Sequence, residues 1–156
     1  MSWVLAAAAA VAGLVAAAQK VAGPTVHDSL AMSDDAAAEV IVVAGSANRV
    51  DTARQEISRE WIEHVLEAPG YNMNQLDRFT IWSEVVVIDN DGDIAAARGR
   101  CYQIVDEWGQ AIEADVTLGG AVDHAWIAVI GYKPRVEAGA LSILLVGVNC
   151  EAFTGA

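Results

Sequence analysis

Residues 141–150 read LSILLVGVNC, and this apolar segment decides how the rest of the chain is interpreted. Successive side chains of a β-strand point to opposite faces of the sheet, and from residue 141 to residue 148 both faces would be apolar. Residues 85–88 have the same two-sided character. Strands of this kind must be covered on both faces, by a second layer of structure or by another subunit. The chain is therefore predicted to contain a buried β-sheet.

Further strand-like segments precede this one, and short polar turns separate them. They span residues 79–88, 94–105, 111–118 and 125–132. Asp91-Gly92 and Trp108-Gly109 fall between such segments, and dipeptides of this type are typical of β-hairpins. Residues 111–118 alternate between apolar and polar side chains, as a strand with one solvated face does. The sequence thus predicts an antiparallel sheet of about five strands over residues 79–150.

An amphipathic helix is predicted at about residues 48–68. Its apolar side chains recur at helical spacing, namely Val50, Ala53, Ile57, Trp61, Val65 and Ala68. Asn48 is a suitable N-cap, and Pro69-Gly70 would end the helix. Residues 40–43 fit either a short strand or the tail of a helix that begins at Asp34. This helix packed on the sheet gives an α+β fold, with a sandwich-like arrangement as the alternative.

The first nineteen residues carry no charged side chain, and nine of them are alanine. Alanine is the best helix former, so residues 1–20 are predicted to form an apolar helix. One role for it is contact with copies of the chain or neighbouring subunits, because small side chains allow helices to approach closely. The alternatives are a membrane anchor and an uncleaved signal peptide. Residues 21–38 are predicted to be a connector, and residues 39–156 a single α+β domain.

Composition narrows the classes of function. The 156 residues include 9 Lys and Arg against 21 Asp and Glu, which gives a formal net charge of −12. Nucleic-acid binding needs a basic surface, and the basic residues do not cluster, so no nucleic-acid partner is expected. A hydrophobic content of 54% and a charged content of 19% exclude an intrinsically disordered chain.

Groups that are suited to catalysis or metal binding are few and scattered. Asp89, Asp91 and Asp93 have the alternate spacing of oxygen ligands for a hard cation. Asp91-Gly92 is explained by a turn alone, so these residues stay weak candidates, and no metal site and no cofactor is predicted. A small enzyme with a site near Ser46 or Asp123-His124 is an alternative, and it requires a pocket that brings such groups together.

Cys101 and Cys150 are the only cysteines of the chain. One interpretation is a disulfide, which would close a loop of about fifty residues and stabilise the fold by roughly 4 kcal/mol. The other is a pair of buried free thiols, which behave as small hydrophobic groups. The sequence leaves both interpretations open.

The apolar surface exceeds what one small domain can bury, and this excess favours assembly. We expect a non-enzymatic structural subunit of a large symmetric assembly, of the virion or surface-filament type, with copies of itself and neighbouring subunits as partners. The predicted interface residues are Trp3, Leu5, Leu14, Val15 and Trp108, the last as an exposed aromatic anchor at a turn. An exported or membrane-tethered β-rich binding domain is the alternative. The expected location is the virion or the cell surface, outside the cytoplasm.

Overall fold

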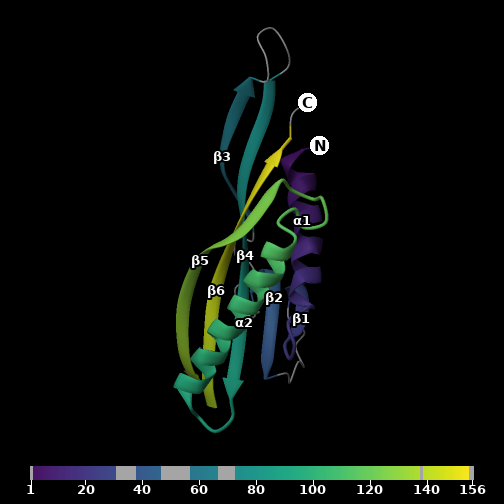
Figure 1. Ribbon diagram of the computed structural model, residues 1–156. Coiled ribbons are helices and arrows are strands. Elements are labelled where there is room, and N and C mark those ends of the chain that lie inside the picture. The colour runs from purple at the N-terminus through teal and green to yellow at the C-terminus, as the bar shows by residue number, and fades with distance from the viewer. Residues whose placement is uncertain (1, 31–37, 47–56, 67–72, 138, 155–156) are drawn as a thin grey trace.

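The computed structural model describes residues 2–30, 38–46, 57–66, 73–137 and 139–154. Within them the chain forms two helices and six strands (Figure 1). Their bounds in chain order are α1 Trp3–Ala18, β1 Thr25–Leu30, β2 Glu39–Ser46, β3 Ile57–Leu66, β4 Met73–Asp89, α2 Ile94–Ala114, β5 His124–Glu137 and β6 Gly139–Phe153.

All six strands belong to one sheet, in which β1, β2, β4, β6 and β5 lie side by side in that order. β1 and β2 are parallel, and the other pairs are antiparallel. β6 follows one edge of β4 from Leu76 to Asp89. The other edge of β4 is divided, because β3 pairs with it up to Ile81 and β2 pairs with it from Glu84 to Val87. β3 and the start of β4 extend past the helices at one end of the molecule (Figure 1).

Both helices pack on the same face of the sheet and contact each other (Figure 1). The main core lies between this helical layer and the sheet. From α2 it contains Ala97, Cys101, Ile104, Val105, Trp108 and Ile112, and from the sheet its members include Ile41, Val43, Phe79, Ile81, Val85, Leu144, Val146 and Val148. Burial of these apolar side chains is the main stabilising contribution to the fold.

The opposite face of the sheet carries a smaller apolar cluster. Val40, Val42, Val86 and Ile143 are buried there, and Leu141 packs against them. Neighbouring residues of β2 and of β6 are therefore buried on both faces of the sheet, which is what their two-sided apolar sequences predict.

A charge-assisted contact ties the helical layer to the sheet. Arg100 of α2 donates to both carboxylate oxygens of Glu39 at the start of β2, at 2.6 Å and 3.0 Å. Its Nη2 also donates to the backbone oxygen of Ala22, at 2.9 Å. A two-pronged guanidinium–carboxylate pair is more directional than a single contact, so Arg100 fixes α2 against both β2 and the connection from α1.

The predicted α+β class is confirmed: an N-terminal alanine-rich helix and a mostly antiparallel sheet are present. The strands predicted at 79–88, 125–132 and 141–150 lie within β4, β5 and β6. Residues 40–43 belong to strand β2 and not to a helix tail. The described strands form one sheet with both helices on one face, rather than a sandwich of two sheets. The predicted connector, residues 21–38, includes β1.

The helix predicted at about residues 48–68 is wrong where the structure describes it. Ile57–Leu66 is strand β3, and residues 48–56 and 67–68 lie outside the described residues. β3 pairs with β4 from Ile57 opposite Ile81 to Leu66 opposite Met73. This ladder prevails over the helical spacing, because β-branched side chains such as Ile62 and Val65 also suit a strand.

The strands predicted at 94–105 and 111–118 are also wrong. Residues 94–114 form α2, and Asp93 is its N-cap, whose side chain accepts a hydrogen bond from the Ala96 backbone N–H at 3.1 Å. Residues 95–97 are all alanine, which favours a helix at this point. The Asp91-Gly92 turn therefore leads into a helix instead of closing a hairpin. The alternation at 111–118 covers the end of α2 and the turns that follow it.

Candidate functional site

α1 is packed on the sheet of its own chain. Its buried residues are Ala6, Ala7, Ala10, Leu14, Ala17 and Ala18. The ring of Trp3 contacts the ring of Phe79 in β4, with 6.1 Å between their centroids. The indole Nε1–H of Trp108 in α2 donates to the backbone oxygen of Leu14 at 3.2 Å. The helix is therefore part of the core of the domain and not a detached tail.

The solvent-facing side of α1 is apolar as well. It is formed by Val4, Leu5, Ala8, Ala9, Ala12 and Ala16, and we call it the α1 outer face. Val4 is 56% exposed and Leu5 is 62% exposed. Surface helices ordinarily carry charged and polar side chains on this side, and a helix that is apolar all round is ordinarily covered all round. The α1 outer face is therefore a candidate contact surface.

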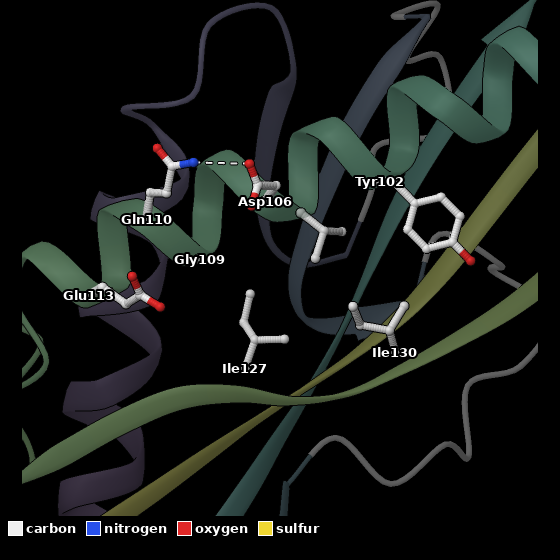
Figure 2. A pocket seen from close by; sticks show the side chains of 8 residues that line it. Tyr102, Asp106, Gly109, Gln110, Glu113, Ile127 and Ile130 are labelled. Atoms are coloured by element: carbon white, nitrogen blue, oxygen red, sulfur yellow. Dashed lines mark hydrogen bonds between the residues drawn. The ribbon is translucent and has the colours of Figure 1, made fainter.

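A second candidate surface is a cleft of about 350 Å³ between α2 and β5 (Figure 2). We call it the α2–β5 cleft. Its lining residues are Tyr102, Val105, Asp106, Gly109, Gln110 and Glu113 from α2, and Ile127 and Ile130 from β5. Tyr102 and Ile130 are 46% and 47% exposed, so apolar side chains at the opening of the cleft are accessible to a partner.

The cleft exists because the helical layer of the molecule covers β5 only in part. Ile127 pairs with Val148 of β6 and Ile130 pairs with Val146, so both isoleucines point to the face on which the helices lie. Val146 and Val148 are fully buried, whereas Ile130 is about half exposed. Gly109 adds no side chain at the point where α2 passes Ile127. One side of β5 is thus left partly uncovered.

The α2 side of the cleft carries negative charge. Asp106 and Glu113 are exposed, and Gln110 donates to the Asp106 carboxylate at 2.9 Å (Figure 2). Ile127 and Ile130 face these side chains from β5 (Figure 2). An apolar floor with an acidic rim suits an apolar partner that brings no negative charge of its own.

The predicted interface residues lie in different environments. Leu5 is exposed on the α1 outer face, while Trp3 and Val15 are half-buried. Leu14 and Trp108 are fully buried within their own chain, so the prediction that Trp108 is an exposed aromatic anchor is wrong. Trp108 was expected at a turn but lies in the middle of α2, where its ring fills the core between α1 and the sheet.

Cys101 and Cys150 are both free and buried, so they form no disulfide in this structure. Burial raises the pKa of both thiols, and it raises that of Cys150 to about 12. The Cys101 Sγ lies 3.4 Å from the backbone oxygen of Ser142, to which it donates. Because the thiolate is the reactive form of cysteine, these surroundings suit packing and not nucleophilic chemistry.

The candidate metal ligands take part in the connection between β4 and α2. The Asp89 carboxylate accepts from the Asp91 backbone N–H at 2.8 Å. Asp93 is the N-cap of α2. In the described part of the chain, no three or more His, Cys, Asp or Glu side chains are grouped so that they could hold a metal ion.

The structure does not bring the candidate catalytic residues together. Asp89 pairs with Ala140 at one end of β6, and His124 pairs with Glu151 near the other end, about 35 Å away along the strand. Asp123 accepts from the backbone N–H of Phe153 at 2.7 Å, which is a turn contact. The backbone of Ser46 pairs with β1 at the end of β2. None of these residues lines the α2–β5 cleft.

A polar cluster lies on the sheet face opposite the helices. Arg78 forms an ion pair with Glu151, and its guanidinium lies 6.0 Å from the ring of Trp126. Thr80 donates to the Asn149 side chain at 2.8 Å. These contacts join β4, β6 and β5 across their ladders, which is a structural role.

The α2–β5 cleft was not predicted, because residues 94–105 were expected to form a strand. Once this segment is read as a helix, Tyr102, Asp106, Gly109 and Glu113 recur at helical spacing beside the buried stripe. Ile130, on the β5 side of the cleft, was correctly placed in a strand. Its exposure depends on how far the helical layer extends over the sheet, and this is set by tertiary packing and not by the local sequence.

Among the residues that the structure describes, no helix has both the length and the apolar character needed to cross a membrane. A comparison of the chain with models of protein families and with curated proteins finds no match.

Proposed function

We propose that the chain is a non-enzymatic structural subunit of a large symmetric assembly, of the virion or surface-filament type, in which its partners are copies of itself and neighbouring subunits. The α1 outer face carries this proposal. It is a strip of exposed apolar side chains on a helix that has no charge from Trp3 to Ala18. Surfaces of this kind mark contact sites.

The charge of the molecule supports the choice of this face. Each copy has a formal net charge of −12, so copies repel one another in general. The repulsion is smallest where neither surface places a charge in the contact. An uncharged helix side on an acidic chain is therefore the place where copies can approach closely.

The size of the face favours many weak contacts over one strong contact. Full burial of an exposed Val or Leu side chain contributes about 1.5–3 kcal/mol. Because Val4 and Leu5 are a little more than half exposed, covering them contributes roughly 1–2 kcal/mol each. A single contact of this strength gives no stable dimer, but contacts repeated through a symmetric assembly add up.

The substitution Leu5→Glu tests the proposal. Leu5 is the third residue of α1, and Ser2 is the N-cap, so glutamate at this position completes a capping box and interacts favourably with the helix dipole. The fold should keep its stability while the contact face gains a charge. In size-exclusion chromatography with light scattering, the unchanged chain should form oligomers that grow with concentration, and Leu5→Glu should stay monomeric.

Asn90→Asp is the matched control, because it makes the same change of charge in the exposed turn between β4 and α2. It should assemble like the unchanged chain. The proposal is wrong if the unchanged chain stays monomeric at every concentration, or if Leu5→Glu assembles equally well. It is also wrong if the chain binds phosphatidylcholine vesicles through α1 and forms no oligomers in their absence.

A further inference from the structure

We infer that the α2–β5 cleft receives the α1 outer face of a second copy of this chain. This inference rests on the proposed function and names the two surfaces that meet. The cleft offers apolar side chains that its own chain leaves partly uncovered, with Ile130 and Tyr102 about half exposed. The α1 outer face offers Val4 and Leu5, which project from a narrow ridge of alanines.

The two surfaces lie on opposite sides of the molecule. α1 contacts β1 and β2 at one edge of the sheet, while α2 contacts β5 at the other edge. Figure 1 shows α2 between α1 and the lower part of β5. A contact between different surfaces leaves one unused surface at each end of a pair, so copies continue to add until a ring closes or a filament grows.

A second α1 would also complete the helical layer. α1 and α2 lie next to each other on the sheet, and α2 reaches β5 but leaves part of this strand uncovered. A helix laid beside α2 over Ile127 and Ile130 extends the layer by one element. Recognition then follows the pattern of an apolar helix that lies in an apolar groove.

Charge selects α1 among the elements of this chain. Of the described helices and strands, α1 alone carries no charged residue. Every other described helix or strand carries at least one Asp or Glu, which Asp106 and Glu113 at the rim of the cleft would repel. In addition, Val4 and Leu5 lie in the first turn of α1, where the helix dipole is positive and is attracted by the acidic rim.

The alternative of a strand added to the free edge of β5 fits less well. The β5–β6 ladder is irregular between Ile127 and Val129, and Pro134, which lacks a backbone N–H donor, follows Lys133 in the same strand. Bulges, lysine and proline are the features that protect edge strands from pairing with another strand. Contact through side chains in the cleft is therefore favoured over backbone pairing.

The contact area is small for a stable pair. α1 has sixteen residues and is therefore about 24 Å long. A strip of that length and about 10 Å wide buries roughly 500 Å² over both partners, below the ~1,200 Å² of a standard interface. We therefore expect assembly that depends on concentration and on several contacts per copy.

Cross-linking between two populations of the full chain tests the inference. One population carries Leu5→Cys and the other carries Ile130→Cys, with tags of different size, and a short bis-maleimide is added to the mixture. Ile88→Cys replaces Ile130→Cys in the matched control, because Ile88 is also an exposed isoleucine, lies at the end of β4, and is absent from the cleft lining. The native thiols are buried and should give little background.

A product that joins the two tagged populations for Leu5→Cys with Ile130→Cys, several-fold above the Ile88→Cys control, supports the inference. Products only between two Leu5→Cys chains would overturn it, because they indicate that α1 packs on α1. Equal products with Ile130→Cys and Ile88→Cys would also overturn it. If light scattering shows oligomers but no specific product forms, this inference fails and the proposed function stands; if no oligomers form at all, both fail.

Discussion

The substitution Gly13→Ala measures how tightly α1 is docked on its own domain. A Cβ built on Gly13 would lie 2.6 Å from the Leu118 Cβ and 2.7 Å from the Leu118 backbone oxygen. Neither atom is the end of a flexible side chain, so α1 or the turn at Leu118 has to move. Overpacking of this kind costs about 1–3 kcal/mol.

Helix propensity acts in the opposite direction. Replacing glycine by alanine inside a helix stabilises it by about 1 kcal/mol when the new methyl group meets nothing. Because the cost of the contact with Leu118 is set against this gain, we expect Gly13→Ala to lower the free energy of unfolding by up to about 2 kcal/mol. The sign of the effect reports whether the helix is docked.

Gly99→Ala in α2 is the matched control, since a Cβ at Gly99 would meet no atom within 4 Å. It should raise the free energy of unfolding by up to about 1 kcal/mol. Urea unfolding followed by tryptophan fluorescence gives both values, and each variant is measured in the Leu5→Glu background, in which we expect the chain to be monomeric. If Gly13→Ala stabilises the chain as much as Gly99→Ala does, α1 is not packed against Leu118 and the proposed core is wrong.

Three further predictions concern the buried polar and ionisable groups of the core. Trp108→Phe keeps an aromatic ring but removes the donor to the Leu14 backbone oxygen, so the free energy of unfolding should fall by about 1–3 kcal/mol; an unchanged urea midpoint would contradict the contact. The Cys150 thiol has a pKa of about 12 in the folded chain against a reference value of 9.0. Its contribution to stability is therefore complete below pH 9 and is lost as the pH rises from about 9 towards 12, by up to about 4 kcal/mol. Cys150→Ala should reduce this alkaline loss of stability relative to the unchanged chain, and equal losses in both would refute the assignment. Ellman's reagent should modify Cys101 and Cys150 slowly in the folded chain and rapidly in urea, whereas fast modification of the folded chain would show that the thiols are accessible.

The α+β class and most of the sheet were predictable from the sequence. β4 and β6 contain long apolar runs with β-branched residues. Such runs favour strands that are buried on both faces of a sheet, whatever covers the two faces. β1 was not predicted, because its six residues include polar side chains and their apolar pattern is too short to indicate a strand. Its pairing with β2 depends on a contact between distant segments of the chain.

The sequence predicted strands where α2 lies and a helix where β3 lies, and the reasons for both errors can be read in part from the sequence. In α2, Ala97, Cys101, Val105, Trp108 and Ile112 recur at helical spacing, but the Asp91-Gly92 dipeptide suggested a hairpin. In β3 the helical spacing was present without a helix, because pairing with β4 decided its structure. Local patterns indicate what a segment tolerates, and partners elsewhere in the chain decide between the options.

The candidate surfaces were predictable only in part. An apolar helix was expected at residues 1–20, and Leu5 lies on its exposed side. The helix is apolar on every side, so nothing in its sequence indicates that Leu14 points inward. The α2–β5 cleft arises from the width of the sheet relative to its helical layer, which no local pattern encodes.

The division of one edge of β4 between β3 and β2 has a mechanical consequence. β4 and β6 run through the whole sheet, so a load applied to the projecting β3 end is transmitted to the body as shear along their shared ladder. On the edge of β4 opposite β6, the ladder changes partner between Ile81 and Glu84, and among the described residues no ladder pair joins residues 82–83 to β2 or β3. The hydrogen bond from the Ala44 backbone N–H to the Ser83 hydroxyl, at 3.0 Å, spans this joint. The joint at residues 82–83 therefore separates the β2 side of the sheet from the β3 side, and we expect β4 and β6 to resist most of a bending load applied there.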